Sequence, residues 1–319
     1  MARAWLATWI ALASAGCSSV AQDVPRHAED PAAAWQKQFE RGERFQRSGF
    51  QESAQRNYER ALSLARALPE SDSRRVRTRV ALAEVYVQTG ELAKAALQLE
   101  AALHEQRRLS DDESEAVADL LTRLGKVYIA QDRFAAAQSV LRPAVDIRRA
   151  ELGDRDLETA ASASYLAAAF AGLKDYARAE TMYQSAIAIY SASGPAHVQR
   201  LALAYNNLAR VYRAAGRIEQ AEQYHLQAIR TGSEYKLEGN PNLGVFARDL
   251  AALYAQQGRS AEAEEAYRIA LAQLEDTLGP SHPQVRETLL ALAAQLSAQG
   301  REAEAEKLRQ RAANAAPAP

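Results

Sequence analysis

Residues 205–228 read YNNLARVYRAAGRIEQAEQYHLQA, and the spacing of six positions in this stretch recurs along most of the chain. In this copy the six positions are Leu208, Ala209, Tyr212, Gly216, Ala221 and Ala228. Steps of 42 residues in both directions find the leucine again at Leu82, Leu124, Leu166, Leu250 and Leu292. A small residue always follows it, and an aromatic residue stands at the third position in every copy but the last. Such a shared phase indicates an internal repeat.

The offsets within the repeat predict a helical hairpin. Leucine, small and aromatic residues at these spacings share one side of a first helix, where the small residue lets a second helix approach closely. Glycine at the turn position reverses the chain, and the two alanines, seven residues apart, share a face of the second helix. A further copy, one step of 41 residues earlier, contains Gly42, Phe45 and Gly49. The sequence therefore predicts about seven hairpins.

Two motifs relate the repeat to a known family. Leu278-Gly279-Pro280-Ser281-His282-Pro283 precedes a predicted helix, and Tyr205-Asn206-Asn207-Leu208-Ala209 lies within one. Both are similar to the 42-residue class of tetratricopeptide repeats, which includes kinesin light chains. The resemblance covers about residues 35–313 and implies an all-α, right-handed superhelical solenoid, which does not by itself specify a partner. The repeats are expected at about 35–68, 76–109, 118–150, 160–193, 202–235, 244–277 and 286–313.

The first twenty residues, MARAWLATWIALASAGCSSV, predict export. Their apolar part is near ten residues long, which suits a signal peptide and is too short to span a bilayer. Ser14 to Cys17 resembles the lipobox of bacterial lipoproteins, although leucine usually stands where Ser14 does. The resemblance implies a signal peptide over 1–16, lipid attachment at Cys17 and a flexible tether over 17–34. The alternative is an ordinary secretory signal that is cleaved after Ala15.

The same resemblance gives an expectation for location. Ser18 follows the predicted lipid site, and it is not the aspartate that marks retention at the inner membrane. We therefore expect an outer-membrane lipoprotein that faces the periplasm, with a soluble periplasmic or secreted protein as the alternative. Residues 314–319 are expected to form a disordered tail.

Charge gives no reason to expect a nucleic-acid partner. The 319 residues include 39 lysines and arginines against 40 aspartates and glutamates, for a net charge of −1. Nucleic-acid binding depends on a basic surface that neutralises phosphates, and this balance does not predict one. We expect neither a cofactor nor a small-molecule substrate.

A partner is expected on the concave side, which the first helices of stacked hairpins line. The positions predicted to be exposed there are Thr122, Lys126 and Ile129; Ser164, Ala168 and Ala171; Asn206, Arg210 and Arg213; and Arg248, Ala252 and Ala255. Small side chains would admit an extended peptide, and arginines would meet its carboxylates. Groove asparagines hold the peptide backbone in the kinesin-light-chain class, which Asn206 and Asn207 match. The predicted partner-binding residues are Lys126, Asn206, Asn207, Arg210, Arg213 and Arg248.

Other interpretations of these residues stay open. Arg210 and Arg213 could instead form a solvated helix face with nearby glutamates. His225 occupies a packing position that other copies fill with Tyr183 or Tyr267, which favours a packing role over a metal ligand. With no nucleophile, acid–base pair or metal motif in view, we expect a non-enzymatic adaptor of the cell envelope. The alternative is an assembly factor of an envelope complex that acts through its convex face or its ends.

Overall fold

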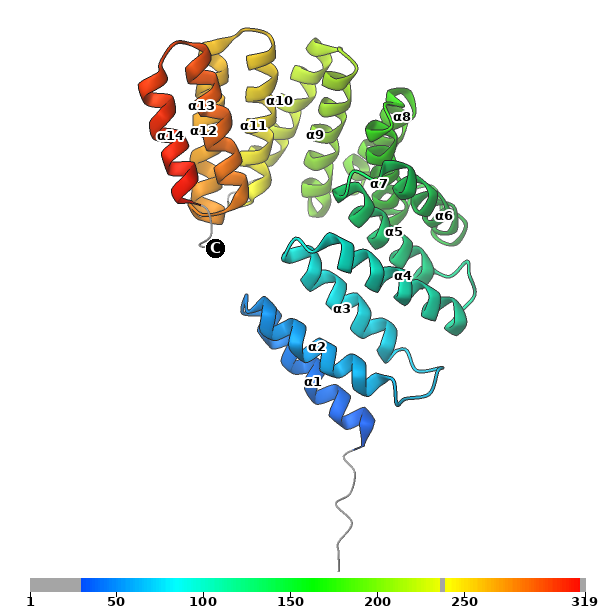
Figure 1. Ribbon diagram of the computed structural model, residues 1–319. Helices are drawn as coiled ribbons and strands as arrows, with labels where there is room; N and C mark the ends of the chain where they lie inside the picture. The colour runs from blue at the N-terminus through cyan, green and yellow to red at the C-terminus, as the bar shows by residue number, and fades with distance from the viewer. Residues whose placement is uncertain (1–29, 236–238, 316–319) are drawn as a thin grey trace, which may run out of the picture. The chain divides into compact units, whose positions relative to one another are not determined.

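The computed structural model describes residues 30–235 and 239–315, and within them the chain is all α-helical apart from turns and one short 3₁₀ segment. Fourteen α-helices form seven consecutive hairpins (Figure 1). The first helices of the hairpins are α1 (Pro31–Arg47), α3 (Arg74–Gln88), α5 (Glu115–Ala130), α7 (Leu157–Gly172), α9 (Val198–Ala214), α11 (Pro241–Gln256) and α13 (Pro283–Ala298). The second helices are α2 (Gln51–Ala65), α4 (Leu92–Leu109), α6 (Phe134–Leu152), α8 (Tyr176–Ala192), α10 (Ile218–Glu234), α12 (Ser260–Leu278) and α14 (Glu302–Asn314). The predicted fold class of about seven helical hairpins is confirmed.

The chain divides into two compact units at a boundary within α3, between Thr78 and Arg79. The first unit is organised around Trp35, which is 1% exposed and stacks on Phe39 with ring centroids 4.8 Å apart. The indole nitrogen of Trp35 donates a hydrogen bond to Thr78 Oγ1 over 2.9 Å, which ties α1 to the start of α3. Residues 31–34, predicted to belong to the tether, are the first residues of α1. The helix begins there because Asp30 accepts a hydrogen bond from the Ala32 amide and Pro31 suits the first helical position.

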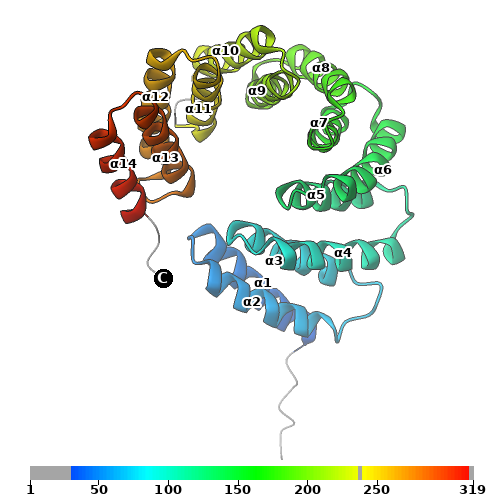
Figure 2. The ribbon, with the colours of Figure 1, turned by 45° about the horizontal axis from the view of Figure 1, so that its top comes forward.

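The second unit extends from Arg79 and stacks its hairpins in chain order. Figure 2 shows α5, α7, α9, α11 and α13 along the inner side of this unit and their partner helices along the outer side. The leucine of the repeat is at most 5% exposed in every copy from Leu82 to Leu292, and the two alanines of the second helix are fully or almost fully buried. The repeated positions therefore form the core within and between the hairpins.

The turn inside each hairpin requires a backbone in the left-handed region. Gly216 has a φ of 76°, and glycine meets the same requirement at three other turns of this unit. Asp132 and Lys174 occupy the equivalent position with φ values of 56° and 63°. A side chain in this region costs roughly 1 kcal/mol or more, so packing of the flanking helices must hold these two turns.

A polar contact joins successive hairpins next to these turns, and we call it the turn clamp. The residue after the turn is Arg217, Arg259 or Arg301, and it forms an ion pair with Glu180, Glu222 or Glu264 on the second helix of the preceding hairpin. Arg217 also lies over the Tyr212 ring, 4.3 Å from its centroid, and the Tyr212 hydroxyl donates to Glu180 over 2.9 Å. Burial and the nearby Glu180 carboxylate raise the pKa of Tyr212 to about 12, so its hydroxyl stays a donor at neutral pH.

Candidate functional site

The inner side of the second unit contains a groove with a volume of about 690 Å³. It spans the third to sixth hairpins, because its walls come from α5, α7, α9 and α11. Its lining residues include Ile129, Asp132, Phe134, Ala168, Ala171, Gly172, Tyr183, Asn207, Arg210, Val211, Arg213, Ala214 and Gln256. Six of the positions singled out from the sequence therefore meet in one surface: Ile129, Ala168, Ala171, Asn207, Arg210 and Arg213.

Small residues make the floor of this groove wide. Ala168 and Ala171 are half-buried on α7, and Gly172 follows them at the end of the helix. A Cβ atom at Gly172 would lie 2.3 Å from the Phe134 ring, so the ring packs directly against the glycine backbone. The groove therefore gains its width at Ala168 and Ala171, whose methyl groups would let an extended main chain approach α7.

Cationic and amide groups on α9 stand beside this floor. Arg210 is exposed, and the nearest carboxylate, that of Asp249, is 3.9 Å from its Nε. Arg213 makes no ion pair with any described residue, and the amide of Asn207 makes no hydrogen bond within the described chain. The two guanidinium groups can therefore still bind a carboxylate, and the Asn207 amide can still bind a peptide group, on one face of α9.

Asn206 is not part of this surface, and the expectation that it is exposed is wrong. It is 3% exposed, because its amide lies between α9, α10 and α11. Its Nδ2 donates to Asp249 Oδ2 over 2.8 Å, and its Oδ1 is 2.8 Å from His225 Nδ1. Since Oδ1 can only accept, Nδ1 of His225 carries the proton. Asn206 thus fixes the Asp249 carboxylate, which lies 3.9 Å from Arg210 Nε.

His225 has the packing role predicted for it. It is fully buried, and its Nε2 has no partner among the described residues. Burial lowers its pKa from 6.5 to about 4; Arg213 and Arg210 lower it further, and only Asp249 acts in the opposite direction. The imidazole is therefore neutral at pH 7, and its protonation is unfavourable in the folded protein.

Because His225 is buried in its neutral form, we expect the free energy of unfolding to fall in acid. Between pH 6.5 and pH 4 the unfolded chain binds a proton at His225 that the folded chain excludes, so stability falls as the pH falls. From pH 7.5 to pH 5 this group alone should remove about 2 kcal/mol of unfolding free energy. Urea titrations of the full chain at both pH values measure it. His225→Gln, which retains an amide donor for Asn206, should show a smaller decrease, and an equal decrease in both proteins would contradict the assignment.

The other predicted binding residues lie outside this groove. Lys126 is exposed 5.2 Å from the centroid of the Tyr165 ring, and it lines a separate depression between α3 and α5. Arg248 forms an ion pair with Glu287 on α13 over 3.0 Å. Thr122, which was expected to be exposed, is buried and lies 3.0 Å from Ser162 Oγ on α7. Cys17 lies outside the described residues.

Several groove residues were missing from the sequence prediction. Asp132, Tyr183 and Gln256 belong to a turn, a second helix and the end of a first helix, whereas the prediction considered three positions of each first helix. Asp132 could have been found, since it is the acidic exception in the turn column. No group of three or more acidic, histidine or cysteine side chains suited to a metal occurs among the described residues. None of the helices described here is both long and apolar enough to cross a membrane.

Comparison with known proteins identifies the repeat. A family model for the tetratricopeptide repeat matches residues 116–192, 173–234, 200–272 and 242–318, which together make up more than half of the chain. No curated protein matches the chain by sequence.

Solved structures agree on the fold. A putative kinesin light chain from Podosopora anserina with nearly identical TPR-like repeats is 22% identical, covering 66% of this chain and 98% of its own, with a TM-score of 0.53. The apo form of RapI is 15% identical over 88% of this chain and 97% of its own, with a TM-score of 0.66. A tetratricopeptide repeat protein from Parabacteroides merdae is 14% identical over 88% and 93%, with a TM-score of 0.61. Because these sequence identities are low, the similarity to the three structures establishes the fold alone.

Proposed function

The chain belongs to the tetratricopeptide repeat family, and we propose that it is a non-enzymatic scaffold of a bacterial cell envelope that binds an extended segment of another protein in the groove. Repeats of this family suggest protein–protein interaction. The observation that carries the proposal is the free hydrogen-bonding capacity of Asn207, Arg210 and Arg213 beside a floor of small residues. The amide suits a peptide backbone and the arginines suit carboxylates, so the expected occupant is an extended segment that contains aspartate or glutamate.

Arg210 and Arg213 could bind a partner only weakly if carboxylates of the protein itself already paired with them. The contacts around these two arginines show little such pairing. Arg217, four residues after Arg213, is held by Glu180 at 2.5 Å, as expected for an arginine with a structural task. Arg210 has only the long contact to Asp249, whose second role is to accept from Asn206. A carboxylate from a partner would therefore gain charge-assisted hydrogen bonds without breaking a close ion pair.

Photo-crosslinking in cells tests the position of the partner. Benzoylphenylalanine at Ala171, on the groove floor, should capture a protein from the envelope, and the site of attachment should lie in an extended acidic segment. The matched position is Ala272, an exposed alanine on the outer helix α12. Capture from Ala272 with none from Ala171 would favour the alternative, an assembly factor that acts through its outer face or its ends.

The envelope location rests on the amino-terminal sequence, and it is tested separately. We expect the mature chain to begin at a lipidated Cys17, held on a membrane with about 0.8 kcal/mol for each buried methylene group. Mass spectrometry of the amino terminus should find acyl groups, and Cys17→Ser should move the protein from the membrane fraction to the soluble fraction. An unmodified chain that begins at Gly16 would show instead that the signal is an ordinary secretory one.

A further inference from the structure

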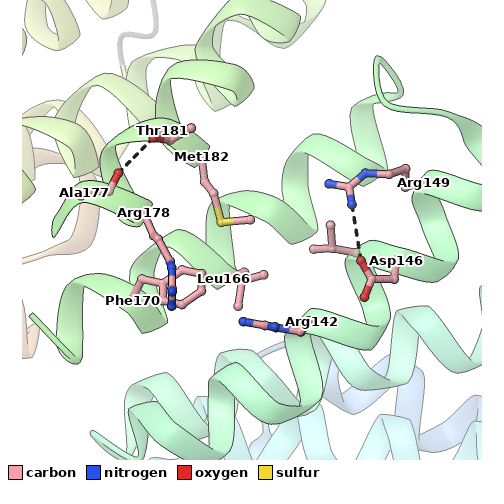
Figure 3. Close-up of a pocket in the computed structure, with 10 residues that line it drawn as sticks. Arg142, Asp146, Arg149, Leu166, Phe170, Ala177, Arg178, Thr181 and Met182 are labelled. Carbon is pink, nitrogen blue, oxygen red and sulfur yellow. Dashed lines mark hydrogen bonds and ion pairs between the residues drawn. The ribbon is translucent and has the colours of Figure 1, made fainter. Parts of the chain in front are cut away.

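A second cleft lies on the outer side of the second unit, between α6 and α8. Its volume is about 470 Å³, and the C-terminal half of α7 closes its base. Its apolar lining consists of Val145, Leu166, Phe170, Ala177 and Met182. Its polar lining consists of Arg142, Asp146, Arg149, Arg178 and Thr181 (Figure 3). Large apolar side chains and guanidinium groups thus meet in one small space.

This cleft opens at a junction in which all three residues of the turn clamp are replaced. Between the third and fourth hairpins the clamp positions are Gln138, Phe170 and Asp175, in place of glutamate, tyrosine and arginine. Phe170 has no hydroxyl with which to bind the preceding helix, and Asp175 instead accepts from the Arg178 amide at the start of α8. At the next junction, Tyr224 packs against Tyr212 with centroids 5.3 Å apart, whereas Met182 occupies the position equivalent to Tyr224. The smaller Met182 side chain leaves open the space that the Tyr224 ring fills in the next hairpin.

The α6 wall of the cleft and its base on α7 are nevertheless held in place. Arg148, one residue before Arg149 on α6, is 3% exposed and forms an ion pair with Glu115 on α5 over 2.8 Å. It also donates to Ser162 Oγ on α7 over 2.6 Å. Because these contacts join α5, α6 and α7 on the buried side, one wall and the base of the cleft are fixed before a partner binds.

The three arginines of the cleft differ in the number of carboxylates with which they form ion pairs. Arg149 pairs with Asp146 and Asp154 at 3.4 and 2.6 Å. Arg178 pairs with Asp175 over 3.2 Å and lies over the Phe170 ring, 5.5 Å from its centroid. Arg142 is exposed and makes no ion pair with a described residue. Figure 3 shows the guanidinium groups of Arg142 and Arg178 both reaching toward Leu166 and Phe170, with Arg149 at the other end beside Asp146.

We propose that this cleft is a docking site for a segment of a partner protein that presents a large apolar side chain next to a carboxylate. The apolar side chain packs against Leu166, Phe170 and Met182, and the carboxylate accepts from Arg142 and Arg178. Asp146 at the far end orients the segment, since it repels a second carboxylate. A protein segment is favoured over an acyl chain because four of the ten lining residues carry charged groups, which hydrocarbon would desolvate without compensation. This site is independent of the inner groove.

Met182 provides a reporter inside the cleft, because the chain has only two methionines, Met1 and Met182. We would label the full chain with ¹³C-methyl methionine and assign the Met182 signal by its loss in Met182→Leu. The probes are two capped hexapeptides, Gly-Ser-Phe-Glu-Ser-Gly and Gly-Ser-Phe-Gln-Ser-Gly. The Phe-Glu peptide should shift the Met182 signal, with an affinity at least about tenfold higher than the Phe-Gln peptide, because only the former supplies a charge.

Two variants separate the cleft from the groove. Arg142→Gln should weaken the Phe-Glu peptide about tenfold with an unchanged unfolding midpoint, since its side chain is exposed. Arg210→Glu with Arg213→Glu should leave the Met182 titration unchanged. Equal affinity for both peptides, no effect of Arg142→Gln, or no shift at millimolar peptide would overturn the proposal. If decanoate shifts the Met182 signal in a saturable way and the Phe-Glu peptide does not shift it, the cleft is an acyl-chain site instead.

Discussion

Charge reversal at Arg210 and Arg213 together is expected to weaken binding of the segment captured from Ala171 by about 100-fold or more, which corresponds to about 3 kcal/mol. Both side chains line the groove, and neither is committed to a close ion pair among the described residues. Glutamates at these positions would remove two charge-assisted hydrogen bonds and add repulsion against a carboxylate of the segment. Isothermal titration of the full chain with a synthetic copy of the segment measures the change.

The control for this pair lies on the same unit. Arg230 is an exposed arginine of the outer helix α10, and Arg155 is another in the turn between α6 and α7. Reversing these two charges changes the net charge of the protein by the same amount and should alter the affinity for the groove segment less than about threefold. A similar loss in both double variants would mean that long-range charge, not the groove, determines binding.

The stability of the third hairpin is expected to depend on one buried charge. Arg148→Ala should lower the free energy of unfolding by about 2 kcal/mol, because it removes the hydrogen bonds of a buried guanidinium to Ser162 and to Glu115, whose own side chain is 42% exposed and can be solvated. Arg148 holds Glu115 with two nitrogens, Nη2 at 2.8 Å and Nε at 3.0 Å, and donates to Ser162 over 2.6 Å. Ser162 would retain only its contact with Thr122. Urea unfolding followed by circular dichroism provides the measurement.

Its neighbour Arg149 makes a close comparison. The Arg149 side chain is 49% exposed and pairs with two exposed aspartates, whereas that of Arg148 is 4% exposed. Arg149→Ala should therefore cost less than about 1 kcal/mol, in line with other surface ion pairs. If both variants unfold with the same loss, the buried network does not stabilise the hairpin.

The sequence predicted the hairpins well because their determinants are local and repeated. The leucine, small, aromatic, turn and alanine positions all recur in one phase, and the periodicity of each is a direct consequence of helix geometry. The predicted start at residue 35 differs from Pro31, because capping by Asp30 and a proline at the first position extend α1 beyond the repeat pattern.

The groove was less predictable, since side-chain exposure depends on distant residues. Asn206 and Asn207 are adjacent and chemically identical, yet only Asn206 is buried. Its partners are His225, nineteen residues later, and Asp249, forty-three residues later. Arg248 similarly has its partner, Glu287, on the next hairpin. A pattern on one helix cannot specify such pairings. The replaced clamp residues Gln138, Phe170 and Asp175, in contrast, can be recognised in the sequence, because each departs from the residue type that the repeat has at its position.

Hydrogen–deuterium exchange of the full chain, with and without the captured segment, tests groove binding most directly. Binding in the groove should slow exchange mainly in α7 and α9, around Ala168 to Gly172 and Asn207 to Ala214, with α14 unchanged. Binding should also leave the outer helices α10 and α12 as they are in the free protein. Slowed exchange confined to the outer helices or to α14, with α7 and α9 unaffected, would contradict the proposal that the inner groove holds the partner.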